Sequence, residues 1–281
     1  MVTVVITHYN RVHLLERALY SFKHNKSAEF NVIIVDDCSN DLEIKKLISL
    51  KKKYNQYFNI DIILIDKKDK WYDNPCIPFN IGIREARGDI VIIQSAECIH
   101  LGNVIDHANK NLTANNYFSY SCYSVDKEQT KSLLTDKDYS PHELLDLINP
   151  PNNAAVTHCE EKGWYNHPVY RPLGYHWCNA YNRDDLLKIK MFDERYSKGV
   201  AYDDDELSFR SKRDLKLNII ESPIVLHQWH GLENYYKQTN QVENQIKQDY
   251  NRSMFERVTQ SDYNNDSVRN DLSLTVDYIK K

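Results

Sequence analysis

Long hydrophobic runs and paired cysteines are both missing from this 281-residue chain. No apolar stretch approaches the roughly 20 residues that a membrane-spanning helix needs. The apolar stretch at 2–6 is too short for the hydrophobic part of a signal peptide, and polar residues follow it. None of the six cysteines forms a C-x-x-C pair, which argues against a zinc site. We therefore expect free thiols, no transmembrane segment and a cytoplasmic location.

An excess of one charge and glycine-rich phosphate loops are missing as well. Lys and Arg number 36 against 40 Asp and Glu, so the net charge of -4 predicts no general attraction to nucleic acid. The seven glycines form neither G-x-G-x-x-G nor G-x-x-x-x-G-K-[ST]. This argues against a dinucleotide-dependent enzyme and against a P-loop NTPase. What remains is an ordinary globular composition, in a length that suits one large domain.

Short runs of β-branched residues dominate the first hundred positions, at 2–6, 31–35, 60–65 and 90–93. Each run is almost continuously apolar, as a strand is when helices cover both faces of a parallel sheet. Helical patterns lie between the runs. The alternation predicts an α/β fold, with a doubly wound and mostly parallel sheet flanked by helices. Ligands of such sheets bind beyond the carboxyl ends of the strands.

The rest of the chain combines regular structure with a polar insertion. We expect helices near 101–112, 184–189 and 203–213, strands near 118–125 and 218–226, and regular structure near 174–181. Residues 126–170 contain several prolines and predict a loop-rich insertion with one short helix near 141–148. The predicted division is a domain over 1–230, with halves at 1–100 and 101–230, and a polar, helical C-terminal extension over 231–281.

Two acids, Asp36 and Asp37, stand together where the second predicted strand ends. At the carboxyl end of a parallel strand, such a pair can accept hydrogen bonds from the N–H of a base or from ribose hydroxyls. The alternative is that they cap the following helix together with Ser39 and Asn40. The residue types alone leave both interpretations open.

The segments VVITHYNR and VIIVDDCSND together resemble the opening of family 2 glycosyltransferases with the GT-A fold. That family begins with a strand, a Thr/Ser-x-Tyr-Asn-Arg-like turn and a long helix, followed by a strand that ends in Val-Asp-Asp-x-Ser. The resemblance implies a nucleotide site that includes Thr7, Tyr9, Arg11, Asp36 and Asp37. In this site Tyr9 would lie against the base, and Asp37 would read its N–H edge.

Two further segments extend the resemblance. Asn80-x-Gly-Ile is similar to the family's Arg-Asn-x-Gly-Ile, with Phe79 where the family usually has Arg. The run IVIIQSAEC stands where the family has Asp-x-Asp, and it lacks the first Asp. The resemblance implies that Asn80 and Ser95 join the nucleotide site and that Glu97 binds a divalent metal, Mn2+ or Mg2+. The missing Asp leaves a pseudoenzyme that has lost its metal as the alternative.

Four consecutive acids, from Asp203 to Glu206, open a predicted helix in the run AYDDDELSFR. Acids in a first turn suit the helix dipole, although four exceed what capping needs. The run resembles the family's Glu-Asp-x-x-Leu-x-x-Arg motif with its Leu and Arg in register. That register implies Asp204 as the catalytic base, which takes the proton from the acceptor hydroxyl. Asp203 or Asp205 would be the base if the register is off by one.

Two histidines, His227 and His230, follow a predicted strand some twenty residues after the acids. Related GT-A enzymes place a metal-binding His here. The resemblance therefore implies His227 as a metal ligand, with His230 as the second choice, because neutral imidazole binds metals. The alternative is a structural role, which is the more common one for a lone histidine.

Aromatic residues are concentrated in the segment EKGWYNHPVYRPLGYHWCNAY. Aromatic faces stack on sugar rings, and the family builds its acceptor site at this position. The resemblance implies Trp164, Tyr165, His176 and Trp177 as acceptor-binding residues. The alternative is an aromatic core for a loop region. A similar loop at 71–73 could approach the donor.

These segments predict a metal-dependent glycosyltransferase of the hexosyltransferase type. It would move a sugar from a nucleotide sugar, first of all a UDP-sugar, to a hydroxyl of a glycan or another acceptor, as in polysaccharide biosynthesis. Family 2 implies inversion, whereas ELSFR also resembles retaining polypeptide N-acetylgalactosaminyltransferases. Two other classes stay open. One is a non-catalytic nucleotide- or glycan-binding protein of the same fold; the other is a sugar-phosphate nucleotidyltransferase, although VVITHYNR lacks the glycine-rich phosphate loop of that class.

Overall fold

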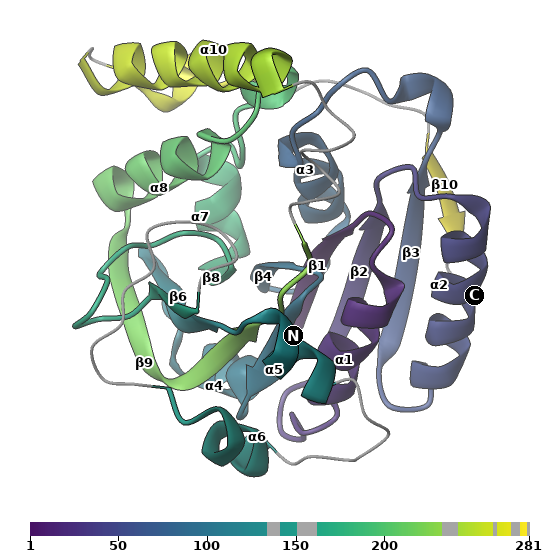
Figure 1. The fold of residues 1–281 in the computed structure, drawn as a ribbon. Helices are drawn as coiled ribbons and strands as arrows, with labels where there is room; N and C mark the ends of the chain where they lie inside the picture. Colours follow the sequence, from purple (N-terminus) through teal and green to yellow (C-terminus); the bar gives the residue numbers. More distant parts are fainter. Residues whose placement is uncertain (134–140, 151–161, 232–240, 261–262, 271–275, 280–281) are drawn as a thin grey trace.

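A computed structural model describes residues 1–133, 141–150, 162–231, 241–260, 263–270 and 276–279, and shows one sheet with helices against both faces (Figure 1). The strands are β1 (Val2–His8), β2 (Phe30–Asp36), β3 (Asn59–Ile65), β4 (Ile90–Ser95), β5 (Cys98–Leu101), β6 (Asn116–Ser124), β7 (Gly163–Asn166), β8 (Cys178–Asn182), β9 (Lys216–His227) and β10 (Val276–Ile279). The α-helices are α1 (Val12–Phe22), α2 (Asp41–Tyr54), α3 (Cys76–Glu85), α4 (Val104–Asn111), α5 (Lys127–Leu133), α6 (Pro141–Ile148), α7 (Arg183–Lys188), α8 (Asp203–Asp214) and α10 (Gln241–Gln260). Short 3-10 helices occupy Lys67–Asp69, Glu194–Lys198 and Asn265–Ser267. The predicted α/β fold is confirmed.

The sheet has the order β10-β3-β2-β1-β4-β8-β6-β9-β5, with β7 paired to β6. The neighbours β3, β2, β1 and β4 run parallel, whereas β8 is antiparallel to β4 and β10 is antiparallel to β3. The register pairs His8 with Asp36 and Thr7 with Ser95. The carboxyl ends of β1, β2 and β4 therefore lie together at one edge of the sheet, where doubly wound folds bind their ligands.

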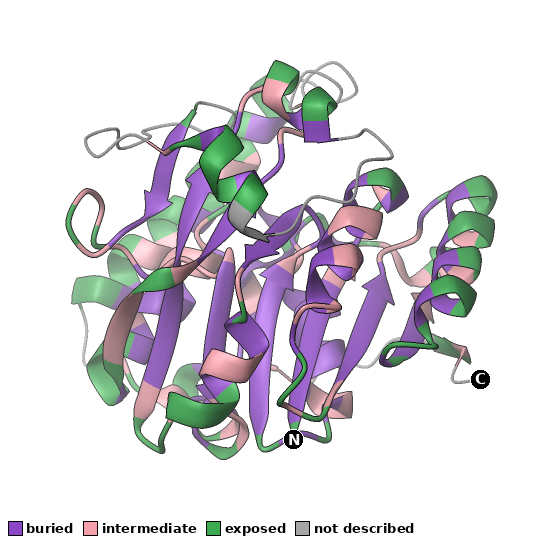
Figure 2. Ribbon diagram, turned by 90° about the horizontal axis from the view of Figure 1, so that it is seen from below, coloured by how far each residue is buried: buried purple, intermediate pink, exposed green. Residues whose placement is uncertain are grey.

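Side chains of the central strands alternate between two hydrophobic clusters, one on each face of the sheet. On β1, Val4 and Ile6 belong to the cluster that includes residues of α1 and α2, whereas Val5 belongs to the cluster that includes residues of α3. Successive side chains of a strand point to opposite faces, so helices on both faces bury the whole run. Figure 2 shows these strands buried beneath helices whose outer surfaces are exposed.

One glycine lets α3 lie directly on the sheet. A Cβ on Gly82 would lie 2.4 Å from Cγ1 of Val5 and 3.0 Å from Cγ2 of Val35. Any side chain at this position would push the helix away from β1 and β2. The glycine of the Asn-x-Gly-Ile segment thus serves the close approach of helix and strand.

Several short elements differ from the sequence prediction. Residues 126–170 contain α5 and β7 in addition to the predicted short helix α6, while 134–140 and 151–161 lie outside the described residues. β5 precedes α4, which fills most of the predicted helix at 101–112. Strands of four residues are too short to show an alternating pattern. They form because they pair with distant partners, β5 with β9 and β7 with β6.

The C-terminal residues return to two separate parts of the sheet domain (Figure 1). α10 packs over α8, where the ring of Phe255 meets that of Phe209, and β10 pairs with β3. Nζ of the buried Lys51 donates to the carbonyl of Ile279 at 2.6 Å and holds β10 in place. Among the described residues, no helix is long and apolar enough to cross a membrane. The five described cysteines are free, as expected, and Cys159 lies outside the described residues.

Replacement of Gly82 by Ala should destabilise the fold. Alanine favours a helix by roughly 1 kcal/mol. The new methyl group would, however, overlap the stiff, buried Val5, and overpacking of this kind costs about 1–3 kcal/mol, so we expect a net loss of about 1–2 kcal/mol in the free energy of unfolding. Urea unfolding followed by circular dichroism measures it, with Ser49→Ala on the exposed face of α2 as a control that should change little. An unchanged midpoint for Gly82→Ala would show that β1 accommodates the methyl group.

Candidate active site

Polar side chains from distant parts of the chain meet at the carboxyl edge of the parallel strands. Tyr9 and Arg11 follow β1, and Glu97 lies in the turn between β4 and β5. The antiparallel register places Trp177, just before β8, beside the end of β4, and pairs His227 at the end of β9 with Cys98. The sheet topology thus assembles one site from segments that lie up to about 220 residues apart.

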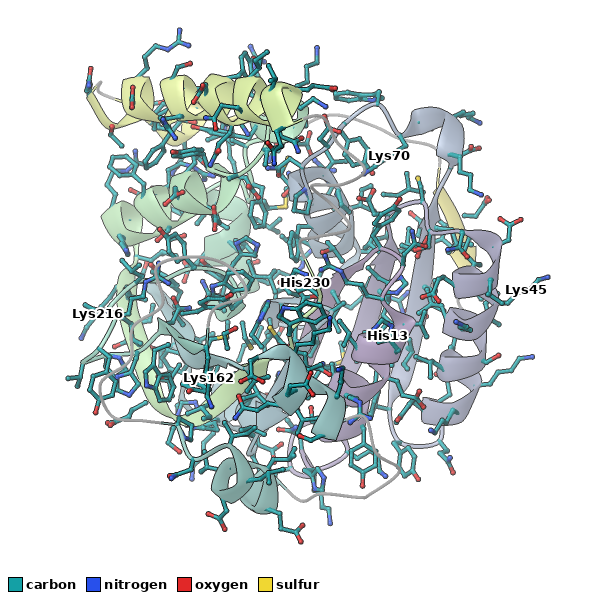
Figure 3. All side chains as sticks on the ribbon, viewed as in Figure 1. His13, Lys45, Lys70, Lys162, Lys216 and His230 are labelled. Carbon is teal, nitrogen blue, oxygen red and sulfur yellow. The ribbon has the colours of Figure 1, made fainter. Side chains whose placement is uncertain are left out.

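Glu97, His227 and His230 form a compact group whose potential ligand atoms all lie within 4.8 Å of one another. Nε2 of His227 is 3.4 Å from Oε1 of Glu97, and Nε2 of His230 is 3.6 Å from the same oxygen. Figure 3 shows His230 near the centre of the molecule, whereas Lys45 points outward from α2. The structure therefore brings together all three residues that were predicted to bind a metal.

The protonation states of this group suit a metal ion. Burial alone would raise the pKa of Glu97, but the Arg11 guanidinium and the imidazoles of His227 and His230 hold it well below its ordinary value. Burial lowers the pKa of His230 to about 3, so its imidazole is neutral. Nδ1 of both histidines is buried without a hydrogen-bond partner among the described residues. One carboxylate and two imidazoles are a donor set that fits a divalent transition metal.

Gln94 holds the turn that presents Glu97. It lies near the end of β4, where the family resemblance predicts an acidic motif. Gln94 is fully buried, and its side-chain amide donates to the carbonyl of Cys98 at 3.1 Å. Its oxygen lies 2.7 Å from Nε2 of His100, whose pKa burial lowers to about 3. Gln94 therefore shapes the β4–β5 turn without a charge, and Ser95 beside it remains partly exposed toward the site.

The two acids after β2 have different partners. Asp36 is buried and accepts hydrogen bonds from Nδ1 of His8 at 2.8 Å and from the N–H of Ser39 at 2.9 Å. The N–H of Arg11 in turn donates to Nε2 of His8 at 3.1 Å, which leaves Nδ1 as the nitrogen that donates to Asp36. Asp36 thus builds the turns after β1 and β2, as the capping alternative proposed, and its carboxylate is not available to a nucleotide.

Asp37 faces the loop that follows β3. Its oxygens accept from the hydroxyl of Tyr72 and from Nζ of Lys70, each at 2.6 Å. Tyr9, which follows β1, is 54% exposed. An aromatic face and a polar carboxylate–lysine pair are groups that can hold a base and a ribose.

Asn80 does not reach the site. It is fully buried in α3, where its amide nitrogen donates to the carbonyl of Phe192 and to Oε1 of Glu194, both at 2.9 Å. Its oxygen accepts from the N–H of Phe192 at 3.0 Å. All of its hydrogen-bonding groups are thus used in fastening α3 to the loop before α8, which leaves none for a nucleotide.

The acidic run opens α8 after a strained turn. Ala201 and Tyr202 both have positive φ, 59° and 65°, which is uncommon for residues with a side chain. Oδ1 of Asp203 then accepts from the amide of Asn74 at 2.7 Å, and Oδ1 of Asp205 accepts from the hydroxyl of Tyr175 at 2.9 Å. These two acids are held by neighbouring loops.

Asp204, between them, accepts only a backbone N–H among the described residues. Burial and then the negative charges of Asp203 and Asp205 raise its pKa well above the ordinary value. Glu206, the fourth acid, is fully buried and paired with the equally buried Arg210. It therefore anchors the helix. Of the four acids, Asp204 is the one without a side-chain hydrogen-bond partner among the described residues.

Some of the predicted aromatic residues belong to the hydrophobic core, and others border the metal-binding group. Trp164 is buried in a hydrophobic cluster against Tyr123, so the predicted acceptor contact is wrong for this residue and the core alternative holds. Tyr165 is also buried, but it stacks on Trp177 at 4.6 Å between ring centroids, and both rings border His227. Trp177, partly exposed, thus forms a wall beside the metal-binding group.

His176 connects this group to the acids. Burial lowers the pKa of His176, while the charges of Asp203 and Glu97 act in the opposite direction. The ring packs against Phe79, which stands at the position of the family's Arg, with 5.1 Å between centroids. Its Nδ1 is buried without a partner among the described residues, as is Oδ2 of Asp203. In the chain, His176 stands between Tyr175, which donates to Asp205, and Trp177, whose ring borders His227.

Sequence reasoning missed several residues around the site, namely His8, Lys70, Asn74 and Tyr175. Each is polar and follows or precedes a strand that ends at the site edge, which was the available signal. Their partners, however, lie between 28 and 129 positions away, in Asp36, Asp37, Asp205 and Asp203. No local pattern identifies such pairs.

Comparison with known proteins agrees with this geometry. The sequence model of the family described as Glycosyl transferase family 2 matches residues 3–166, more than half of the chain. No curated protein matches the chain. Many solved structures are similar in fold, and three of them illustrate the similarity. The mannosyltransferase PcManGT from Pyrobaculum calidifontis, in complex with GDP-Man and Mn2+, has a TM-score of 0.57 at 14% identity, covering 94% of this chain and 65% of that chain.

The other two structures are similar in extent. TarS 1-349 of S. aureus in complex with UDP-GlcNAc has a TM-score of 0.54 at 13% identity, covering 82% of this chain and 59% of that chain. GalNAc-T7 with UDP, GalNAc and Mn2+ has a TM-score of 0.56 at 15% identity, covering 82% of this chain and 44% of that chain. The chain spans less than two thirds of the length of each of these structures.

Loss of one predicted ligand should weaken metal binding. We expect His230→Gln to lower the affinity for Mn2+ by more than about 10–100-fold, because even residues that only support a ligand contribute that much. Titration of the protein with Mn2+, followed by electron paramagnetic resonance of the free ion, measures the affinity. His13→Gln, an exposed histidine of α1, is the matched control and should bind Mn2+ like the wild type. Equal affinity in all three proteins would place the ion elsewhere.

Proposed function

Because this chain belongs to glycosyl transferase family 2, we propose that it transfers a sugar from a nucleotide-sugar donor to an acceptor hydroxyl with the help of a divalent metal. The observation that carries the proposal is the proximity of two clusters. The segment 175–177 contacts both: the hydroxyl of Tyr175 donates to Asp205 of the acidic run at 2.9 Å, and the ring of Trp177 lies 4.8 Å from that of His227 in the metal-binding group. A metal site and a carboxylate base on one face of a nucleotide-binding sheet are what such a transfer requires.

The donor would bind beyond the carboxyl ends of β1 and β2. The exposed ring of Tyr9 would stack on the base, and Asp37 with Lys70 would bind the base edge or the ribose. Thr7 and Ser95, which face each other at the ends of β1 and β4, border the same position. A UDP-sugar is our first choice, because TarS was solved with UDP-GlcNAc and GalNAc-T7 with UDP.

Glu97, His227 and His230 would hold the metal ion. When bound, a divalent ion offsets the negative charge that builds on the departing diphosphate. Two imidazoles favour Mn2+ over Mg2+, because Mg2+ prefers ligand sets made of oxygen alone. PcManGT and GalNAc-T7 were both solved with Mn2+.

Asp204 would act as the base in a single displacement. As its carboxylate takes the proton of the acceptor hydroxyl, the acceptor oxygen would bond to the anomeric carbon and the bond from that carbon to the diphosphate would break. This order of events inverts the anomeric centre. Asp203 and Asp205, held by Asn74 and Tyr175, would keep Asp204 in place.

The acceptor would approach along the wall formed by Trp177 and Tyr165, beside His176. The partly exposed Trp177 offers an aromatic face for a sugar ring, and its Nε1 is buried without a partner among the described residues. We therefore propose a glycan or another hydroxyl compound as the acceptor. Against the non-catalytic alternative, we note that Gln94 shapes the turn in place of the missing Asp and that Glu97, His227 and His230 together could hold a metal ion.

Replacement of Asp204 by Asn should abolish most of the transfer. Loss of a general base costs about 10²–10⁴-fold in kcat. The measurement is release of nucleotide from UDP-sugars, and from GDP-mannose, in the presence of Mn2+ and with Mn2+ chelated. Asp205→Asn, an isosteric change beside it, should keep most of the activity. Release that is metal-independent and equal in all three proteins would contradict the mechanism, and intact nucleotide binding without any turnover would favour a binding protein.

The pH dependence of kcat should report the raised pKa of Asp204. The base works only when deprotonated, so activity is lost as the pH falls through this pKa. The acidic limb should therefore lie at higher pH than an ordinary Asp, with its pKa of about 3.9, would give. Asp205→Asn removes one of the negative charges that raise this pKa and should move the limb to lower pH. Profiles recorded at saturating Mn2+ test this, and a limb that stays in place would assign it to another group.

A further inference from the structure

Arg11 contacts Oε1 of Glu97, the same carboxylate oxygen that His227 and His230 face. Its guanidinium Nη1 lies 3.3 Å from Oε1 of Glu97, the atom that also faces His227 and His230. The side chain of Glu97 is 5% exposed, whereas that of Arg11 is 36% exposed. The carboxylate is thus fixed inside the protein, and the guanidinium reaches it from the solvent side.

Arg11 is the permanent positive charge at this site. An arginine stays protonated at any physiological pH. The other groups that face Oε1 of Glu97 are the imidazoles of His227, at 3.4 Å, and His230, at 3.6 Å. Among the described residues, Arg11 is therefore the permanently charged cation paired with a nearly buried carboxylate, which would otherwise be costly to keep ionised.

The backbone of Arg11 is held independently of this contact. Its N–H donates to Nε2 of His8 at 3.1 Å, and its carbonyl accepts from the N–H groups of Leu14 and Leu15, both at 3.0 Å. The side chain can therefore leave Glu97 without any change in the start of α1. It stands two residues after Tyr9, beside the position proposed for the donor.

We propose that Arg11 is a counter-cation that exchanges partners, pairing with Glu97 in the metal-free protein and with the donor diphosphate once a metal ion binds Glu97. The inference rests on the proposed function, since it assumes a divalent ion on Glu97 and a diphosphate beside it. An ion on Glu97 would repel the guanidinium, and two negative phosphates would attract it in a bidentate geometry. Metal and donor should consequently each increase the affinity for the other.

The first test is the Mn2+ affinity of the protein without donor. Arg11→Gln should bind Mn2+ about tenfold more tightly than the wild type, within the range of about 5–150-fold that is usual for coupled sites. This is opposite in direction to the loss expected for His230→Gln. Arg11→Lys keeps the charge, so its Mn2+ affinity should stay near that of the wild type. Lys45→Gln, an exposed change of equal charge on α2, should also bind Mn2+ like the wild type.

The second test is the coupling between Mn2+ and UDP. We expect UDP to raise the Mn2+ affinity of the wild type by a larger factor than that of Arg11→Gln, because only the wild type gains the exchange of partners. Electron paramagnetic resonance of free Mn2+, with and without UDP, gives both factors in the same samples. Neither measurement depends on turnover.

The outcomes separate this inference from the proposed function. Mn2+ affinity in Arg11→Gln that is equal to or weaker than in the wild type, or an unchanged coupling factor, would overturn the partner exchange while leaving a metal-assisted transferase intact. The same follows if Arg11→Lys and Arg11→Gln behave alike, since the charge would then be irrelevant. A wild-type protein that binds no Mn2+, with or without UDP, would overturn both proposals together.

Discussion

The candidate active site is organised around one carboxylate that the fold holds away from water. Glu97 is nearly buried, yet its pKa lies well below the ordinary value, so it stays charged where an isolated carboxyl would take up a proton. That state requires positive or polar groups from elsewhere, and they come from the turn after β1 and from the end of β9. The sheet register that brings these segments together is therefore the condition for any metal chemistry here.

The acids at the start of α8 depend on a different part of the chain. α8 begins after two residues with positive φ, and the C-terminal helix supports them. Asn251 of α10 is fully buried and donates to the carbonyl of Ala201 at 2.8 Å, while Arg252 donates to the hydroxyl of Tyr202 at 2.8 Å. A Cβ on Gly199 would lie 2.1 Å from Oδ1 of Asn251, which explains the glycine. The polar extension thus keeps an unfavourable backbone in place next to the site.

The same helix also reaches the donor side. Nζ of Lys247 pairs with Asp73 at 2.9 Å, in the loop whose Lys70 and Tyr72 bind Asp37. One helix therefore contacts both the loop of the proposed donor site and the turn before the proposed base. An exposed ion pair contributes little to stability, so the effect of Lys247 is on loop position rather than on folding.

What the sequence determined by itself was local in nature. Its continuous apolar runs specified the parallel strands, because strand burial depends on neighbouring positions. The family resemblance of short segments then pointed to Glu97, His227 and the acids of α8. Tertiary structure decided which polar groups were already satisfied. Asn80 and Trp164 matched the family pattern, but internal contacts bury them away from the site. Asp203 and Asp205 accept hydrogen bonds from Asn74 and Tyr175, whereas Asp204 has no side-chain partner among the described residues. A side chain's hydrogen-bond partners lie far along the chain, so only the folded arrangement shows which carboxylate is left over.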